Sequence, residues 1–205
     1  MDGTKTDPRR SPLADPGYRY VEHTALEPMR AADWAQLEPQ RREFMAGRQA
    51  KYALDLLASF ESEPSFGYQV NNYRHCLQSA TLALQTGRDE EFVAVCLLHD
   101  IGFTLSMPSH GEFSAALLRP FVSERNHWML KHHQYFQSFH CHEHPSGGDR
   151  LVRERFRGHP DFEYTAEFIA TLDQNATDPA IESPKLDFFR PMVERLFAKP
   201  PKDLP

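Results

Sequence analysis

The chain has 205 residues, 40% hydrophobic and 12% aromatic, with a formal net charge of −6. This length fits one domain plus an extension, and an acidic balance without a basic block argues against a nucleic-acid partner. No apolar stretch approaches the length of a membrane span, which argues against a membrane partner. The start lacks a secretory core, and the three cysteines lack CxxC spacing, so we expect a cytoplasmic protein. We expect it to be a monomer or a homodimer.

The first part of the chain is expected to be peripheral. Residues 1–17 carry three prolines among polar residues and are predicted to be a flexible leader. Residues 18–62 are predicted to form an N-terminal helical extension, in which Asp33 caps one helix from Trp34 to about Phe60. The segment Glu61–Pro64 breaks this helix.

Residues 63–199 are predicted to form an all-α core, because no convincing alternating strand pattern appears. Gly102 is expected to end one helix in the left-handed conformation. The predicted helices cover residues 71–86, 90–100, 110–118, 124–137, 162–174 and 185–197. Their predicted caps are Asp89, a Ser109–Glu112 capping box, Ser123 and Asp161.

The adjacent residues His99 and Asp100 end an apolar run and suggest a metal site. An ionisable pair is expensive to bury unless something pairs with it, and a metal ion is a common partner. A core histidine beside a surface aspartate would be the simpler interpretation of this pair alone. Further candidate ligands on successive predicted helices favour the metal. The full set is His75, His99, Asp100, His110, His133 and Asp173.

Two neighbours compete for places in this set. His132 and His133 cannot both face inward, and His133 shares a helix side with Met129 and Phe136. Asp178 competes with Asp173 but falls in a predicted loop. Four histidines and two aspartates can fill two metal sites if one aspartate bridges, which suits both hydrolysis and oxygen chemistry.

The order H…HD…H…H…D resembles the HD-domain superfamily. Three local motifs, His75–Ala80, Leu97–Gly102 and His110–Phe113, resemble its mixed-valent diiron oxygenase branch, which contains the inositol and phosphonate oxygenases. The similarity covers about residues 65–198 and implies an HD-domain helical bundle.

By this resemblance, one iron would be held by His75, His99 and Asp173, and the other by His110 and His133. Asp100 would bridge the two ions. Such enzymes use a mixed-valent Fe(II)/Fe(III) pair and O₂ to oxidise or cleave a C–C or C–P bond, with all electrons taken from the substrate. The implied substrate is a small hydroxylated or aminated metabolite.

The chain departs from that branch around the expected substrate site. Phe103 stands where relatives carry a lysine or histidine, and Gln137 where phosphonate oxygenases carry a lysine. Tyr68 is near the position of a gating tyrosine, so it is predicted to be catalytic alongside Asp100. Phe103, Gln137, Tyr68 and Gln78 are the predicted substrate contacts, and they favour a less anionic substrate.

Two alternative functions remain. The first is a metal-dependent HD phosphohydrolase acting on a phosphate ester or nucleotide, in which the metals activate water. The second is a non-catalytic regulator that keeps the fold. Separately, His140, His142 and His144 alternate along one segment, where they either bind a further metal or cover a pocket mouth.

Overall fold

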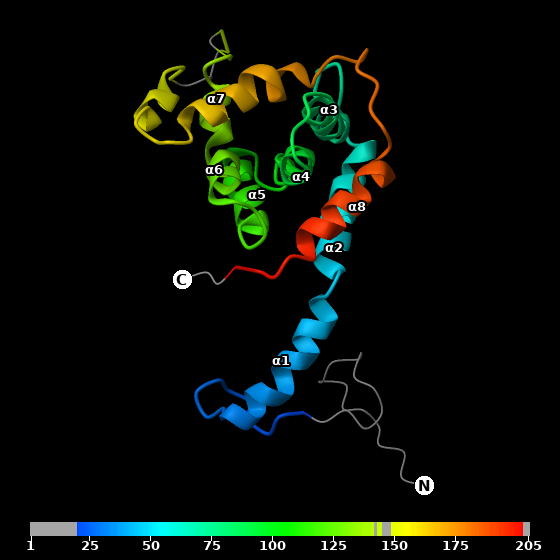
Figure 1. Cartoon of the computed structure of the whole chain (residues 1–205), viewed down its shortest axis with the longest axis vertical. Coiled ribbons are helices and arrows are strands. Elements are labelled where there is room, and N and C mark those ends of the chain that lie inside the picture. Colours follow the sequence, from blue (N-terminus) through cyan, green and yellow to red (C-terminus); the bar gives the residue numbers. More distant parts are fainter. Residues whose placement is uncertain (1–19, 142, 145–148, 203–205) are drawn as a thin grey trace. The chain divides into compact units, whose positions relative to one another are not determined.

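The computed structural model describes residues 20–141, 143–144 and 149–202, and every regular element in these ranges is a helix (Figure 1). The prediction of an all-α protein is confirmed. The predicted leader over residues 1–17, and His142, lie outside the described residues. None of the described helices has the length and apolarity needed to cross a membrane.

The structure divides between Met45 and Ala46 into two compact units. The smaller unit contains α1 (Ala31–Met45), in which no residue is buried. Asp33 lies in its first turn rather than at the cap, and accepts a hydrogen bond from the backbone N–H of Arg30 at 2.7 Å. The predicted helix from residue 34 to 60 is wrong, because Gly47 takes a left-handed conformation (φ 71°) and begins a new helix.

The larger unit contains seven α-helices and four short 3₁₀ turns among its described residues. The division after Met45 puts α2 and η1 in this unit, whereas the sequence analysis placed the boundary after residue 62. The helices are α2 (Arg48–Ser59), α3 (Asn72–Gln85), α4 (Glu90–Leu98), α5 (His110–Leu118), α6 (Glu124–Gln137), α7 (Phe162–Thr171) and α8 (Leu186–Phe197). The 3₁₀ turns are η1 (Phe60–Ser62), η2 (Met107–Ser109), η3 (Val152–Phe156) and η4 (Asp173–Asn175).

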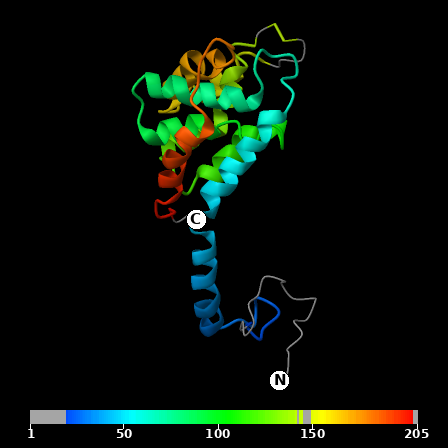
Figure 2. The ribbon, with the colours of Figure 1, turned by 90° about the vertical axis from the view of Figure 1, so that its right-hand side faces the viewer.

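Helix α4 lies at the centre of this unit. Every residue from Phe92 to Leu98 is buried, as expected for a helix that is apolar on all sides. It packs against α3, α6 and α8, while α2 packs on α8, and α6 on both α5 and α7 (Figure 1 and Figure 2). The residues that follow α4 therefore start deep inside the bundle.

Two of the predicted caps are confirmed. Asp89 accepts a hydrogen bond from the backbone N–H of Phe92 at 2.8 Å, and Ser123 accepts one from Asn126 at 3.3 Å. These contacts satisfy N–H groups that the first helical turn leaves free. They fix where α4 and α6 begin.

Ser109 and Asp161 occupy the N-cap positions of α5 and α7, as predicted, but neither side chain bonds to the first turn of its helix. The hydroxyl of Ser109 pairs with that of Ser106 at 2.6 Å, and the Asp161 carboxylate accepts from Arg125 Nε at 2.8 Å. Each side chain bonds instead to another side chain. Two helices are also shorter than predicted: α4 stops at Leu98, and α7 stops before Leu172, whose φ of −120° leaves the helical region.

Gly102 does not take the predicted left-handed conformation. Its role is steric: a Cβ there would lie 2.8 Å from Cβ of Phe113 and 3.0 Å from the carbonyl oxygen of His110. The missing side chain lets the start of α5 approach the turn after α4. This close approach brings His110 toward His99 and Asp100.

Candidate metal centre

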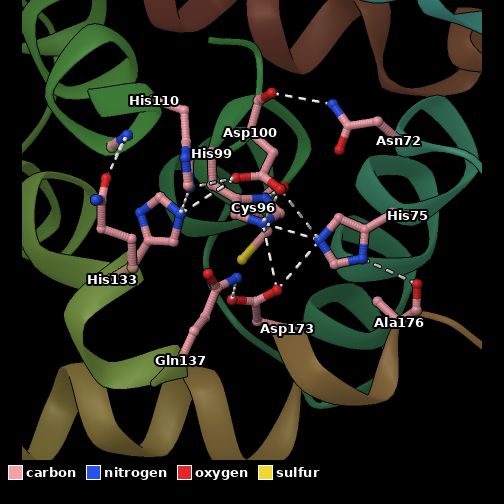
Figure 3. Close-up of polar contacts among 12 residues, drawn as sticks. Asn72, His75, Cys96, His99, Asp100, His110, His133, Gln137, Asp173 and Ala176 are labelled. Carbon is pink, nitrogen blue, oxygen red and sulfur yellow. Dashed lines mark hydrogen bonds and ion pairs between the residues drawn. The ribbon is translucent and has the colours of Figure 1, made fainter. Parts of the chain in front are cut away.

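The six predicted ligands come together in one place, although five elements supply them. His75 lies on α3, His133 on α6 and Asp173 in η4, and the other three flank the loop from α4 to α5. Figure 3 shows all six side chains pointing toward a common centre. All except His75 are buried, and His75 is nearly so.

The first cluster consists of His75, His99 and Asp173, with one oxygen of Asp100. His75 Nε2 lies 3.1 Å from His99 Nε2 and 3.1 Å from Asp173 Oδ1. His99 Nε2 lies 3.5 Å from the same Asp173 oxygen. Asp100 Oδ2 lies 3.7 Å from the Nε2 atoms of both His75 and His99.

The second cluster consists of His110 and His133, with the other oxygen of Asp100. The two Nε2 atoms lie 3.0 Å apart, and each is 3.2 Å from Asp100 Oδ1. Asp100 therefore presents Oδ2 to the first cluster and Oδ1 to the second (Figure 3). His99, Asp100 and His133 also have ligand atoms within 4.8 Å of one another, so the clusters are contiguous.

Each of the four histidines has its ring orientation and tautomer set by a backbone carbonyl. A carbonyl oxygen can only accept, so Nδ1 carries the hydrogen, and in the neutral ring Nε2 keeps a lone pair. Metal-binding histidines typically have this kind of support. The acceptors of the four Nδ1–H groups are Ala176 for His75 (3.0 Å), Cys96 for His99 (2.7 Å), Met107 for His110 (2.8 Å) and Leu130 for His133 (2.7 Å).

The two carboxylates give the centre a strong preference for positive charge. Burial by itself opposes protonation of His99, yet Asp100 and Asp173 raise its pKa above the usual value. The pKa of His133 is raised against burial in the same way by Asp100. Conversely, burial opposes ionisation of Asp100 and Asp173, but the surrounding histidines hold both pKa values below the usual range.

The donor set fits two metal ions. In each cluster two Nε2 atoms face each other at 3.0–3.1 Å. Because both rings carry hydrogen on Nδ1, no hydrogen bond can cross this contact unless one ring gains a proton. A cation between them satisfies both lone pairs and the adjacent carboxylate. Imidazole and carboxylate suit iron, zinc and manganese alike, so the geometry supports a pair of metals without naming the element.

A pocket of about 400 Å³ opens onto the first cluster. Its lining includes His75, Asp100 and Asp173, so a molecule in the pocket can reach both clusters' shared ligand. Its described wall also includes three of the four predicted substrate contacts, Phe103, Tyr68 and Gln137. The site thus combines buried metal-type ligands with access from outside.

Gln137 also lines the pocket, but its amide points at a ligand. Its Nε2 donates to Asp173 Oδ2 at 2.8 Å, which leaves Oδ1 facing His75 and His99 (Figure 3). Gln78 lies outside the pocket lining and is buried, with Nε2 donating to the carbonyls of Asp178 and Ile181. Gln137 thus supports Asp173 from within the pocket lining, whereas Gln78 lies away from that lining.

The competing side chains lie elsewhere. His132 stacks on Trp128, with ring centroids 4.4 Å apart, and Asp178 is exposed and accepts from the backbone N–H of Ala180 at 2.8 Å. His140 lines the pocket, and neither it nor His144 belongs to a cluster of three metal-type ligands among the described residues.

Sequence reasoning missed two residues at this site. Asn72 donates to the backbone carbonyl of Asp100 at 3.0 Å, which holds the bridging residue from the side of α3 (Figure 3). Phe66 lines the pocket and has a positive φ of 54°. Neither carries a local sequence signal, because both roles depend on the tertiary structure.

No protein-family model matches the chain. A curated relative, the (1-hydroxy-2-(trimethylamino)ethyl)phosphonate dioxygenase (glycine-betaine-forming) of Leisingera caerulea, is 30% identical over 165 residues, which cover 67% of this chain and 84% of the relative. The chain belongs to the family of that dioxygenase. This family membership, together with the buried His/Asp clusters, supports an oxidoreductase with a metal centre.

Proposed function

We propose that the protein is an O₂-dependent, non-haem diiron oxygenase of the HD-domain type. It oxidises or cleaves a C–C or C–P bond of a small hydroxylated or aminated metabolite. The observation that carries this proposal is Asp100, whose two oxygens face two separate histidine clusters. The relative supports the reaction type, since it is named as a dioxygenase of a hydroxylated, aminated phosphonate.

The distances support the ligand assignment that the resemblance implies. His75, His99 and Asp173 would hold one iron, His110 and His133 the other, and Asp100 would join both. Two iron ions bound there would supply O₂ activation and the one-electron steps that side chains cannot perform.

The chain's own residues prepare the site for that chemistry. The four carbonyl-bound Nδ1–H groups keep the Nε2 lone pairs directed at the centre. Gln137 holds one oxygen of Asp173, and Asn72 holds the backbone at Asp100. Five of the six ligands are buried, and the pocket gives access to the centre, where a bound substrate would displace water.

Phosphate ester hydrolysis is the second candidate, because two bridged metals can also activate water. The described pocket lining contains no lysine or arginine to bind the charge of a phosphate. A dioxygenase relative also favours oxygen chemistry over hydrolysis.

The test uses protein loaded with Fe(II) without oxygen and then exposed briefly to O₂. We expect the electron paramagnetic resonance signal of a coupled Fe(II)/Fe(III) pair and two irons per chain. In a screen of small hydroxylated or aminated metabolites that includes the substrate named for the relative, we expect one O₂ consumed per product formed. Native zinc or manganese with O₂-independent phosphate release would overturn the proposal.

A matched pair of variants on α6 localises the signal. His133→Gln should lose the coupled signal and one iron, because His133 supplies one of three donors to the second cluster. His132→Gln should keep both, because His132 stacks on Trp128 on the other side of the helix. Equal loss in the two variants would contradict the ligand assignment.

A further inference from the structure

The pocket has a buried floor and an exposed mouth. Asp100 and Asp173 are 5% and 1% exposed, whereas Phe66 and Tyr68, which line the same pocket, are 66% and 67% exposed. The metal-type ligands therefore form the floor, and two aromatic rings stand at the rim. A substrate with two different chemical groups could therefore place one group at the floor and the other at the mouth.

Residues 63–71 connect η1 to α3 and carry both rings. Part of this segment has an unfavourable backbone conformation. Phe66 is the one non-glycine residue with positive φ among the described residues, and Gly67 follows with φ 100°. Such conformations cost about 1–3 kcal/mol and concentrate at functional sites. Exposed apolar side chains are common on this chain, so it is the backbone of Phe66, together with its place in the pocket lining, that points to a role.

The base of the segment is firmly attached. Thr104 donates to Glu63 Oε2 at 2.7 Å, which ties the segment to the loop after α4. At the other end of the segment, the side chain of Asn71 reaches back to three carbonyl oxygens between residues 60 and 63. Asn71 Nδ2 donates to the carbonyl oxygens of Phe60 (3.2 Å), Glu61 (3.0 Å) and Glu63 (3.1 Å).

The charges of the pocket differ between its two levels. Among its described lining residues there is no lysine or arginine, and the carboxylates are both at the floor. With metals bound there, the floor becomes cationic and takes the oxygen-bearing end of a substrate. An aromatic face attracts a cation through its quadrupole, so the rim suits a positively charged end.

We propose that Phe66 and Tyr68 form a subsite for the quaternary or tertiary ammonium group of the substrate. The group packs on the aromatic faces at the mouth, while the hydroxyl-bearing carbon lies at the floor near Asp100. This inference rests on the proposed function, because it orients the substrate of the same centre. It makes the two rings specificity determinants for charge.

Two compounds of nearly equal shape test the subsite. Choline carries a trimethylammonium group, and 3,3-dimethylbutan-1-ol carries the uncharged carbon equivalent. Both are titrated calorimetrically into iron-loaded protein without oxygen, so binding is measured apart from turnover. A cation–π contact predicts that choline binds about two- to thirty-fold more tightly.

Variants assign this preference to the rings. Phe66→Leu and Tyr68→Leu should each reduce it, whereas Tyr68→Phe should retain it because the ring remains. Phe188→Leu and Tyr52→Leu are the matched controls, since both rings are half exposed and lie outside the pocket lining. These two controls should leave the preference unchanged.

The possible results distinguish a failure of the proposed subsite from a failure of the proposed oxygenase function. Equal affinities for the two compounds, no binding of either, or a preference that survives both leucine variants would overturn the subsite, whatever the turnover. A ring-dependent preference in a protein that consumes no O₂ would keep the subsite and overturn the proposed function.

Discussion

The two histidine clusters share Asp100 but are built in different ways. The first draws its ligands from α3, the turn after α4 and η4, and offers four donors including Asp100. The second comes from the neighbouring helices α5 and α6 and offers three. The first cluster is thus assembled by contacts between distant segments, and the second by one pair of packed helices.

The supports of the two clusters differ accordingly. Gln137 crosses from α6 to hold Asp173 of the first cluster. The second cluster depends on a glycine: a Cβ on Gly111 would lie 2.8 Å from the carbonyl oxygen of Leu130 and 3.2 Å from His133 Nδ1. The first cluster is therefore positioned by a hydrogen bond from Gln137, and the second by the close packing that Gly111 allows. Substitutions can therefore damage the clusters together or one at a time.

The largest effect is expected from Asp100→Asn, which removes the donor that the clusters share. The amide keeps the shape of the side chain but loses the charge that balances two cations. We expect loss of the coupled iron pair and a fall in O₂-dependent activity beyond the roughly 10- to 100-fold effect typical of residues that only support ligands. Iron content and O₂ uptake measure this.

Asp178→Asn is the control for that substitution. Asp178 is exposed and uses one oxygen to accept from Ala180, which an asparagine can also do. It should keep two irons and full activity. Retention of both irons in Asp100→Asn would rule out the bridge.

Gln137→Ala should weaken the first cluster alone. Without the amide, Asp173 is free to turn its carboxylate, and we expect iron affinity at that cluster to fall about 10- to 100-fold. Gln174→Ala is the control, since Gln174 also lines the pocket but donates to the carbonyl of Ala170. Metal titration should show two unequal affinities in Gln137→Ala; an unchanged titration would remove Gln137 from the site.

Gly111→Ala should weaken the second cluster, and it has the smallest expected effect of the three substitutions on activity. The added methyl meets backbone, which cannot move aside cheaply, so a loss of about 1–3 kcal/mol is expected. This corresponds to a fall of roughly 2–10 °C in Tm. The second iron should bind more weakly.

Gly158→Ala is the matched control, because nothing lies within 4 Å of a Cβ at that position. It should leave both the Tm and the iron stoichiometry unchanged. If Gly111→Ala behaves like Gly158→Ala in a thermal melt with iron titration, the close contact of α5 with α6 does not support the site.

Much of this centre could be predicted because its signals are local. The helical fold follows from apolar periodicity, and the caps Asp89 and Ser123 act within three residues of themselves. The six ligands were selected as histidines and aspartates in apolar helical patterns, and the structure brings them into one place. Their assignment to two irons stays a prediction.

The errors arise where a distant partner competes with a local preference. Asp161 has the sequence of a cap, yet Arg125 from another helix pairs with it. Gly102 looks like a helix terminator but is needed because α5 approaches it. Gln137 lines the pocket, so its predicted substrate contact stays a prediction, but the sequence does not show that its amide also reaches Asp173 on another element. No single-segment pattern contains these partners.

The acceptors of the histidine Nδ1–H groups are local for three rings and distant for the fourth. His99, His110 and His133 each bond to a carbonyl three residues earlier, so their rings are oriented as soon as their own segments form. His75 instead bonds to Ala176, 101 residues away. The orientation of this ring therefore depends on the docking of the chain beyond η4, so a substitution near Ala176 can disturb the first cluster from a distance along the sequence.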